Sequence, residues 1–488
     1  MSRSHVARAA MPALGTWAVT AVLGGLVPSA ALAQTTAPPS PVAPASAAAA
    51  ASPTAAAGAP GPAPVALAPA TMAIADTNAK PITVADAVTV ALAHNPDALT
   101  SAVDVQSADA SRANIGGQLG PKLHFDGALT SWNSAFYLSF GGENFEVRKR
   151  NTGTASFTLS QPITGLFTLF DQYKVAKIGV DVAAIQREAA RRNVALTVIQ
   201  AYYGLLARTR LSAVADASVT QLEAQQKQAQ SQFDNGVIGK NDLLRAGLAL
   251  ATAKQRAIET RGQIVIAKAQ LAQAMGVSPD SPLQAEPFSG AEPAAPEPDI
   301  ASAEAHALTQ RVEVRELDRR IEQGEAGVSA AKAKLAPQIS AVANYTHFGG
   351  SAFQQADASY IGLVGSWDIW DWGTTWSGVN AADAELAKAR IARTKLEDQI
   401  RVEARQAFVN TQTARDALGV ARAAVTQAEE NYRIVTKKFD ANAATSFDMV
   451  DAESLLTQVR AQVESAQYDY LLARAALESA TGAPLPGM

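Results

Sequence analysis

The sequence contains one pattern of residues twice. Setting Phe233 on Phe439 gives an offset of 206 residues (439 − 233), and no gap is needed to extend the match on either side. The offset superposes the following pairs: Asp234 and Asp440, Asp242 and Asp448, Ala246 and Ala452, Leu250 and Leu456, and Gly276 and Gly482. A second offset of 216 residues (337 − 121) pairs Pro121 with Pro337. The pattern predicts a tandem duplication, in which the two halves fold alike.

Each half reads as a helix, two strands and a very long helical hairpin. Small and apolar residues recur at alternating spacings of three and four, which is typical of a coiled-coil seam. The seam residues are Leu243, Ala246, Leu250, Ala253, Ala257, Thr260, Ile264, Ala267 and Leu271 in the first half, and Met449, Ala452, Leu456, Val459, Val463, Ala466, Tyr470, Ala473 and Leu477 in the second. The segment from Leu166 to Phe233 contains no proline, and a helix of about 68 residues spans roughly 100 Å.

Four candidate strands lie between the helices. Apolar residues alternate through residues 123–129, 155–161, 339–345 and 361–369. Strands of about ten residues fit a tilted membrane barrel, whereas no stretch beyond the N-terminal region is apolar and long enough for a membrane helix. The segments between the strands, 134–150 and 347–358, are rich in glycine and polar residues and are expected to be loops. The predicted fold class is therefore an α+β membrane protein, a tandem-duplicated protomer with long coiled-coil helical hairpins and four β-strands.

The N-terminus has the features of a secretory signal peptide. Arg3 and Arg8 precede an apolar run, and Ala31-Leu32-Ala33 fits the small-residue cleavage pattern. The predicted organisation is a signal peptide at 1–33, an Ala/Pro-rich disordered tether at 34–80, the first repeat at 81–290, the second repeat at 291–482 and a C-terminal tail at 483–488. The chain has no cysteine, so a lipid-modified cysteine, a disulfide and a thiolate metal site are all excluded.

The composition and motifs argue against several functional classes. The formal net charge of −4 at pH 7 provides no basic surface for nucleic-acid phosphates. The five histidines are scattered, and the chain contains no HExxH pattern, phosphate-binding loop or GxSxG elbow. We therefore expect no enzymatic activity, no cofactor and no metal site. Acidic pairs such as Glu429 and Glu430 are expected to be solvated helix faces.

The tryptophans beyond the predicted signal peptide gather in or beside the candidate strands. They are Trp132, Trp367, Trp370, Trp372 and Trp376. An aromatic girdle at a membrane interface is one interpretation of this distribution. The alternative is the core of an ordinary β-sheet.

Four short motifs follow one another in the chain. They are Ile82-Thr83-Val84-Ala85-Asp86-Ala87-Val88 with Ala91-Leu92 and Asn95-Pro96; Leu119-Gly120-Pro121-Lys122-Leu123, echoed at Leu335-Ala336-Pro337-Gln338-Ile339; Leu159-Ser160-Gln161-Pro162-Ile163; and Phe233-Asp234-Asn235-Gly236 with Asp242, Leu244 and Ala246. Together they resemble the outer membrane factor family, whose type member is TolC, over about residues 81–482. The resemblance implies a homotrimer in the outer membrane, in which each protomer contributes four strands to a 12-stranded β-barrel that stands on a periplasmic α-helical barrel.

The resemblance also implies roles for residues at the hairpin tips. Asp448 and Asp451 match the family's periplasmic gate acids, although Asp448 could equally be a carboxylate that stabilises a helix N-terminus. Ala444 stands where the type member carries an arginine that latches the closed gate, so this chain departs from the family pattern at that position. The expected docking sites for a periplasmic adaptor protein are the tip residues Gly236, Asp242, Leu244, Phe439 and Asn442.

The function implied by the resemblance is passive. The chain is expected to be the outer-membrane exit duct of a tripartite efflux system, with outer-membrane lipid around it and with an adaptor (membrane fusion) protein and an inner-membrane pump of RND or ABC type as partners. A duct for type I protein secretion is a close alternative. A periplasmic coiled-coil adaptor or structural protein is an alternative of a different class, and it would be soluble.

Overall fold

The computed structural model describes residues 81–288, 299–352, 354–441 and 443–488. The chain divides into two units, Met1–Leu67 and Ala68–Met488, and every described residue belongs to the second unit. The predicted signal peptide and tether, the junction of the two repeats at 289–298, and Asn442 lie outside the described residues.

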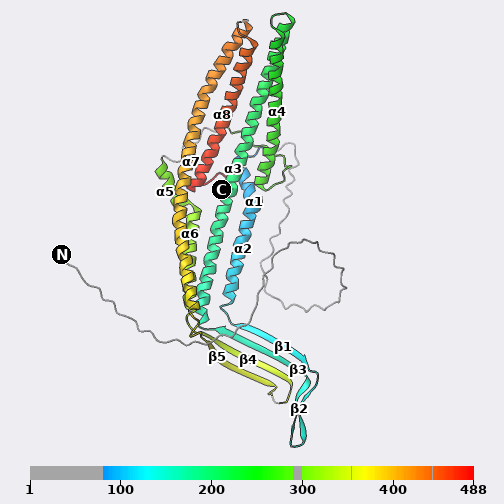
Figure 1. The fold of residues 1–488 in the computed structure, drawn as a ribbon, viewed down its shortest axis with the longest axis vertical. Coiled ribbons are helices and arrows are strands. Elements are labelled where there is room, and N and C mark those ends of the chain that lie inside the picture. Colours follow the sequence, from blue (N-terminus) through cyan, green and yellow to red (C-terminus); the bar gives the residue numbers. More distant parts are fainter. Residues whose placement is uncertain (1–80, 289–298, 353, 442) are drawn as a thin grey trace, which may run out of the picture. The chain divides into compact units, whose positions relative to one another are not determined.

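The order of the helices, with the strands between the second and third of each half, repeats along the second unit (Figure 1). The first half contains α1 (Val84–His94), α2 (Pro96–Gly117), β1 (Lys122–Ser131), β2 (Phe136–Phe140), β3 (Glu143–Pro162), α3 (Gly165–Asp234) and α4 (Lys240–Met275). The second half contains α5 (Ile300–Gln310), α6 (Val312–Ala333), β4 (Gln338–Ser351), β5 (Asp357–Ser366), α7 (Thr374–Asp440) and α8 (Ser446–Thr481). Helices α1 and α5 both have 11 residues, α2 and α6 both have 22, and α4 and α8 both have 36.

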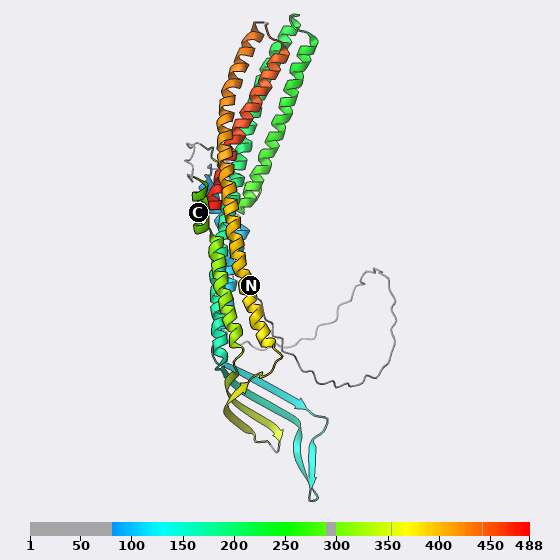
Figure 2. The same cartoon turned by 60° about the vertical axis from the view of Figure 1, so that its left-hand side comes forward.

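The long hairpins form as the heptad seams predict. Helix α3 runs for 70 residues without a break and packs against α4, and α7 runs for 67 residues and packs against α8 (Figure 2). The seam residues Ala246, Leu250, Ala257, Ala267 and Leu271 of α4 are buried. Small seam residues let the backbones of the two helices in a hairpin approach each other closely along the seam. No described helix has a stretch long and apolar enough to cross a lipid bilayer.

Two glycines at equivalent places end the helices α4 and α8. Gly276 has φ +71° and Gly482 has φ +80°, the left-handed conformation that favours glycine at a helix C-terminus. A Cβ on Gly276 would lie 2.5 Å from the carbonyl oxygen of His94, where α1 meets α2. A Cβ on Gly482 would lie 2.9 Å from the carbonyl carbon of Gln310, where α5 meets α6. Each glycine therefore closes the same joint in its own half of the chain.

The sheet is antiparallel, with strand order β1-β3-β4-β5, and β2 pairs with β3 outside this path. The expectation of four strands is therefore too low by one, because part of the segment 134–150 forms a hairpin rather than a loop. Gly141 and Gly142 have φ +66° and +91°, which suits the tight primed turn of a two-residue hairpin. The second expected loop is shorter than predicted, since β4 extends to Ser351 and β5 begins at Asp357.

The register of the sheet separates two faces. Residues directly opposite each other on neighbouring strands share a face. One face, the apolar face, carries Leu123, Phe125, Leu129, Phe157, Leu159, Tyr345, Ile361 and Leu363. The other, the polar face, carries His124, Asp126, Thr130, Thr152, Ser156, Thr158, Asn344 and Thr346. The apolar face is open in the single protomer, where Leu129 is 94% exposed and Ile361 is 89% exposed.

Candidate functional site

The two hairpin tips lie at the ends of the long helices farthest from the sheet (Figure 1). The first tip turns at Gly236, which has φ +72° and open space where a Cβ would stand. Leu244, in the second turn of α4, is 59% exposed, and Asp242 donates its backbone N–H to the Gly239 carbonyl at 3.1 Å. Phe439 is only 3% exposed, so its ring packs within the second tip and offers no surface for docking in the protomer.

Asp448 takes part in a capping box at the start of α8. Its Oδ2 accepts hydrogen bonds from the backbone N–H of Thr445 at 2.8 Å and from the Thr445 hydroxyl at 2.7 Å. The hydrogen bond from the Thr445 backbone, with that from its hydroxyl, lowers the pKa of the exposed Asp448 carboxyl. This stabilisation of the helix start is present above the usual aspartate pKa near 4 and is lost as the pH falls through the lowered value.

Asp451 lies one turn beyond Asp448 on α8, and the two carboxylates share a helix face. Asp451 is exposed, and it makes no ion pair with any residue in the described ranges. The structure thus gives Asp448 a local structural role while leaving Asp451 without one. A function in gating stays a prediction for both residues.

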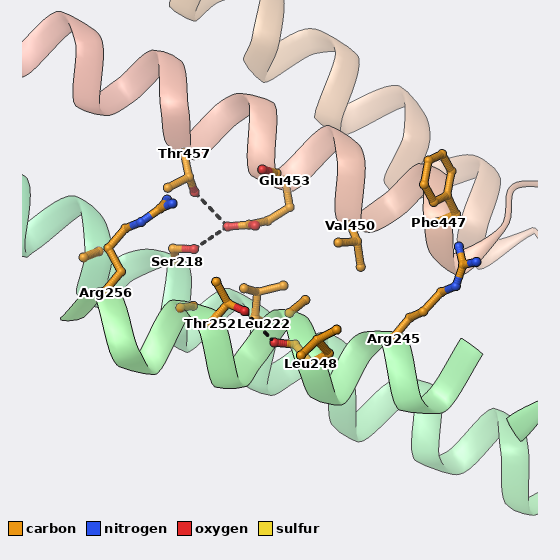
Figure 3. Close-up of a pocket in the computed structure, with 14 residues that line it drawn as sticks. Ser218, Leu222, Arg245, Leu248, Thr252, Arg256, Phe447, Val450, Glu453 and Thr457 are labelled. Atoms are coloured by element: carbon orange, nitrogen blue, oxygen red, sulfur yellow. Dashed lines mark hydrogen bonds between the residues drawn. The ribbon is translucent and has the colours of Figure 1, made fainter. Parts of the chain in front are cut away.

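A cavity of about 400 Å³ lies between α3, α4 and α8, close to the tips (Figure 3). Leu222, Leu248 and Val450 give it apolar walls. Arg256 stands at one end, and at the other end Arg245 places its guanidinium carbon 5.6 Å from the centre of the Phe447 ring. The cavity lies between the first hairpin and the second, because its lining residues come from both. The sequence alone did not indicate it.

Glu453 of α8 connects the two hairpins at this cavity. Its side chain is almost fully buried, with 3% of the residue exposed. Its Oε1 accepts a hydrogen bond from the Ser218 hydroxyl of α3 at 2.6 Å and one from the Thr457 hydroxyl at 2.8 Å (Figure 3). Glutamate is seldom buried without partners, because burying its carboxyl group costs free energy. The hydrogen bonds from these two hydroxyls offset part of that cost. One feature in the sequence could have indicated this role: Ser446, Glu453 and Thr457 are spaced by seven and four residues, beside the apolar seam.

Other polar side chains at the contact of α3 with α8 have no such partners. Both amide atoms of Gln225 and the hydroxyl oxygen of Ser446 are buried, with no hydrogen-bond partner in the part of the chain that the structure describes. An unsatisfied buried polar group costs about 1–3 kcal/mol. Two polar connections between described residues join the hairpins near the tips: the Glu453 network, and a hydrogen bond from the Gln228 side-chain amide of α3 to Asp440 of α7 at 3.1 Å.

The five tryptophans do not lie together. Trp367, Trp370, Trp372 and Trp376 follow β5 where the sheet meets the helices, and they are between 58% and 88% exposed. Trp132 follows β1 at the opposite end of the strands and donates its indole N–H to Thr152 on the polar face, at 3.0 Å. Trp132 therefore does not belong to the apolar face, and the girdle remains a prediction for the other four.

Comparisons with known proteins agree on one family. The family model described as outer membrane efflux protein matches residues 87–277 and 305–483. The outer membrane efflux protein BepC of Brucella suis is 24% identical over 343 residues, which are 68% of this chain and 73% of BepC. The fold resembles the Campylobacter jejuni outer membrane channel CmeC, with a TM-score of 0.72 at 18% identity over 82% of this chain and 85% of CmeC. It also resembles the outer membrane protein VceC of Vibrio cholerae, with a TM-score of 0.71 at 18% identity over 82% of this chain and 96% of VceC. The chain belongs to the outer membrane efflux protein family.

Proposed function

We propose that the protein is a passive, non-enzymatic exit duct of the outer membrane, which works as a trimer in a tripartite efflux system. The sheet carries the proposal, because one protomer exposes a continuous apolar face and leaves the outer edges of β1 and β5 without a partner strand in the described residues. Open edges and an exposed apolar face are costly in water. A closed barrel in lipid satisfies both, because every strand is then paired and the apolar face contacts the acyl chains.

The proposed trimer rests on the number of strands in one protomer, which is too small to form a closed barrel. The four strands of the main path cannot close on themselves around an aqueous channel, and β1 of one copy offers a free edge to β5 of the next. Three copies give 12 strands, the number that the family resemblance implies. The exposed apolar face and the family membership both argue against a soluble periplasmic coiled-coil protein.

The efflux role rests on the relatives and on the hairpin tips. BepC is an outer membrane efflux protein and CmeC is an outer membrane channel, and the chain shares their fold or family. We propose that the tips around Gly236 and Asn442 contact a periplasmic adaptor, and that an inner-membrane pump of RND or ABC type supplies the energy. A duct for type I protein secretion would have the same architecture, so the transported substrate separates the two functions.

Deletion of the gene, followed by complementation, tests the efflux role. We expect the deletion to raise sensitivity to toxic compounds and the wild-type chain to restore resistance. A Gly236→Trp chain is expected to reach the outer membrane as trimers without restoring resistance, because a bulky residue with φ near +72° disturbs the tip. Gly236→Asn is the control, since asparagine tolerates this backbone conformation. Unchanged drug sensitivity together with a missing exported protein would favour type I secretion, and loss of the Gly236→Trp trimer would show that the tip is needed for folding.

The gate acids can be tested by removing their charge. In a trimer, Asp448 and Asp451 form two rings of three carboxylates, whose negative potential concentrates cations. The Asp448→Asn, Asp451→Asn double variant is therefore expected to prefer cations less and to be blocked less by trivalent cations in planar bilayers. Asp242→Asn, at the equivalent position of the first half, is the matched control. If selectivity and block are unaltered in the double variant, both residues act only at the start of α8.

A further inference from the structure

An arginine and a tryptophan are stacked at the end of the sheet away from the helices. The guanidinium carbon of Arg148 lies 3.7 Å from the centre of the Trp132 ring. The indole N–H of Trp132 is held by the hydroxyl of Thr152, so the ring has a fixed orientation. Stacking on a fixed ring holds the guanidinium in one place, which lowers the entropy that it loses on binding a ligand.

The register places this pair on the polar face. Thr130 is opposite Thr152 in the β1–β3 ladder, and the next pair on that face brings Trp132 opposite Arg150, with the Trp132 N–H donating to the Arg150 carbonyl at 2.7 Å. Arg150 shares the face of Trp132 because the two residues are opposite each other, and Arg148 lies on that side because its guanidinium stacks on the Trp132 ring.

Strand β3 contains a bulge next to this pair. Between Arg148 and Gly153 the register of β3 against β4 shifts, so residues 149–152 leave the ladder with β4. Gly350 of β4 approaches the bulge so closely that a Cβ on it would lie 2.5 Å from the carbonyl oxygen of Asn151. Bulges of this kind change the direction of side chains at sheet edges and near functional sites.

Three basic residues at the bulge, Arg148, Lys149 and Arg150, have no acidic partner among the described residues. The Nε of Arg148 is buried without an acceptor in the same part of the chain. Glu146 is the nearest acid along the strand, two residues from Arg148, and it makes no ion pair with Arg148 either. A half-buried guanidinium that has no ion pair is stabilised by binding an anion at its accessible N–H groups.

We propose that Arg148 and Arg150, oriented by Trp132, form a binding site for oxyanions such as phosphate or carboxylate groups. This placement rests on the proposed function, in which the polar face lines the pore. The site then contacts anionic solutes as they leave the channel. Phosphate groups of outer-leaflet lipid have the same chemistry as these solutes. The site would select anions at the end of the protein opposite to the acidic hairpin tips.

Inorganic phosphate tests the site in two ways. In a planar bilayer of phosphatidylcholine, which has no phosphorylated glycolipid, phosphate added on the side of the strand loops is expected to reduce the single-channel current. In detergent, phosphate is expected to change the emission of Trp132, measured as the difference between the wild-type chain and Trp132→Phe. The second measurement does not need an open channel. Arg148→Gln is expected to weaken both effects about tenfold or more, since a hydrogen bond to a charged group typically contributes more than one decade of affinity.

Lys149→Gln is the matched control, because it removes the same charge from the neighbouring residue, for which the described part of the chain shows no stacking on Trp132. It is expected to change phosphate affinity less than about twofold. Equal effects of the two variants, or no effect of Arg148→Gln, would overturn the proposal. Binding that appears only in vesicles containing phosphorylated glycolipid would assign the site to lipid and overturn its contact with solutes. A protein that conducts ions but ignores phosphate would disprove this site alone, whereas a protein that forms no channel would disprove the proposed function.

Discussion

A Gly276→Ala variant is expected to lose about 3 kcal/mol or more of its free energy of unfolding. Alanine in the left-handed conformation costs about 1–2 kcal/mol. The added Cβ would also lie 2.5 Å from the His94 carbonyl oxygen and 2.6 Å from the Asn95 Cα, and both are backbone atoms that cannot move aside as a side chain would. The loss would be measured by thermal or denaturant unfolding of the purified protein, together with the yield of trimers.

Gly262→Ala is the control for this substitution. Gly262 lies within α4 as well, and a Cβ on it would meet nothing within 4 Å. Alanine should therefore raise helix stability there by about 0.5–1 kcal/mol. Gly482→Ala should behave like Gly276→Ala, because it closes the equivalent joint of the second half. If Gly276→Ala were as stable as Gly262→Ala, the close approach of α4 to the α1–α2 joint would be wrong.

A Glu453→Ala variant is expected to destabilise the contact between the two hairpins by about 2–4 kcal/mol. The substitution enlarges an existing cavity and leaves the hydroxyls of Ser218 and Thr457 without their acceptor. Since Ser218 belongs to α3 and Glu453 to α8, the loss falls on the packing of one hairpin against the other. Hydrogen exchange should therefore accelerate in the first three turns of α8.

Glu453→Gln separates the hydrogen bonds from the packing. Glutamine keeps the side-chain volume and an oxygen acceptor for both hydroxyls, so its effect is expected to stay below about 1 kcal/mol. Ser218→Ala should lie between the two variants. Equal exchange rates in Glu453→Ala and the wild-type chain would mean that the hairpins are held together elsewhere.

The long helices and the duplication could be predicted from the sequence because their signals are local and repeated. The heptad spacing from Leu243 to Leu271 specifies a helix face without reference to the rest of the chain, and its second copy removes the ambiguity of alanine-rich sequence. The hairpin of β2 with β3 was missed for the opposite reason. Glycine and polar residues between Ser134 and Arg150 indicate a loop by composition, although Phe136, Leu138 and Phe140 alternate as they do in a strand.

The candidate site was predicted less completely, because several of its contacts join distant segments. The gate and tip roles come from motifs whose residues lie close together in the sequence, and they stay predictions. The pairing of Ser218 with Glu453 joins residues 235 apart in the sequence, and the spacing within α8 does not indicate which residue of α3 is the partner. Likewise, Trp132 was assigned to a girdle by residue type, whereas the register of β1 with β3 puts it on the polar face.

The pairing of β3 with β4 also determines the order in which the protein can fold. Phe157 on β3 is opposite Tyr345 on β4, so the central pair of the sheet joins residues 188 apart (345 − 157). Each helical hairpin closes a much shorter loop, and contacts between residues close in sequence form faster than contacts across a large part of the chain. During export, α3 and α4 can therefore pair before the sheet is complete, because β4 and β5 belong to the second half of the chain. Until then the apolar side of β1 and β3 is exposed to water, which makes the partly exported chain prone to aggregation.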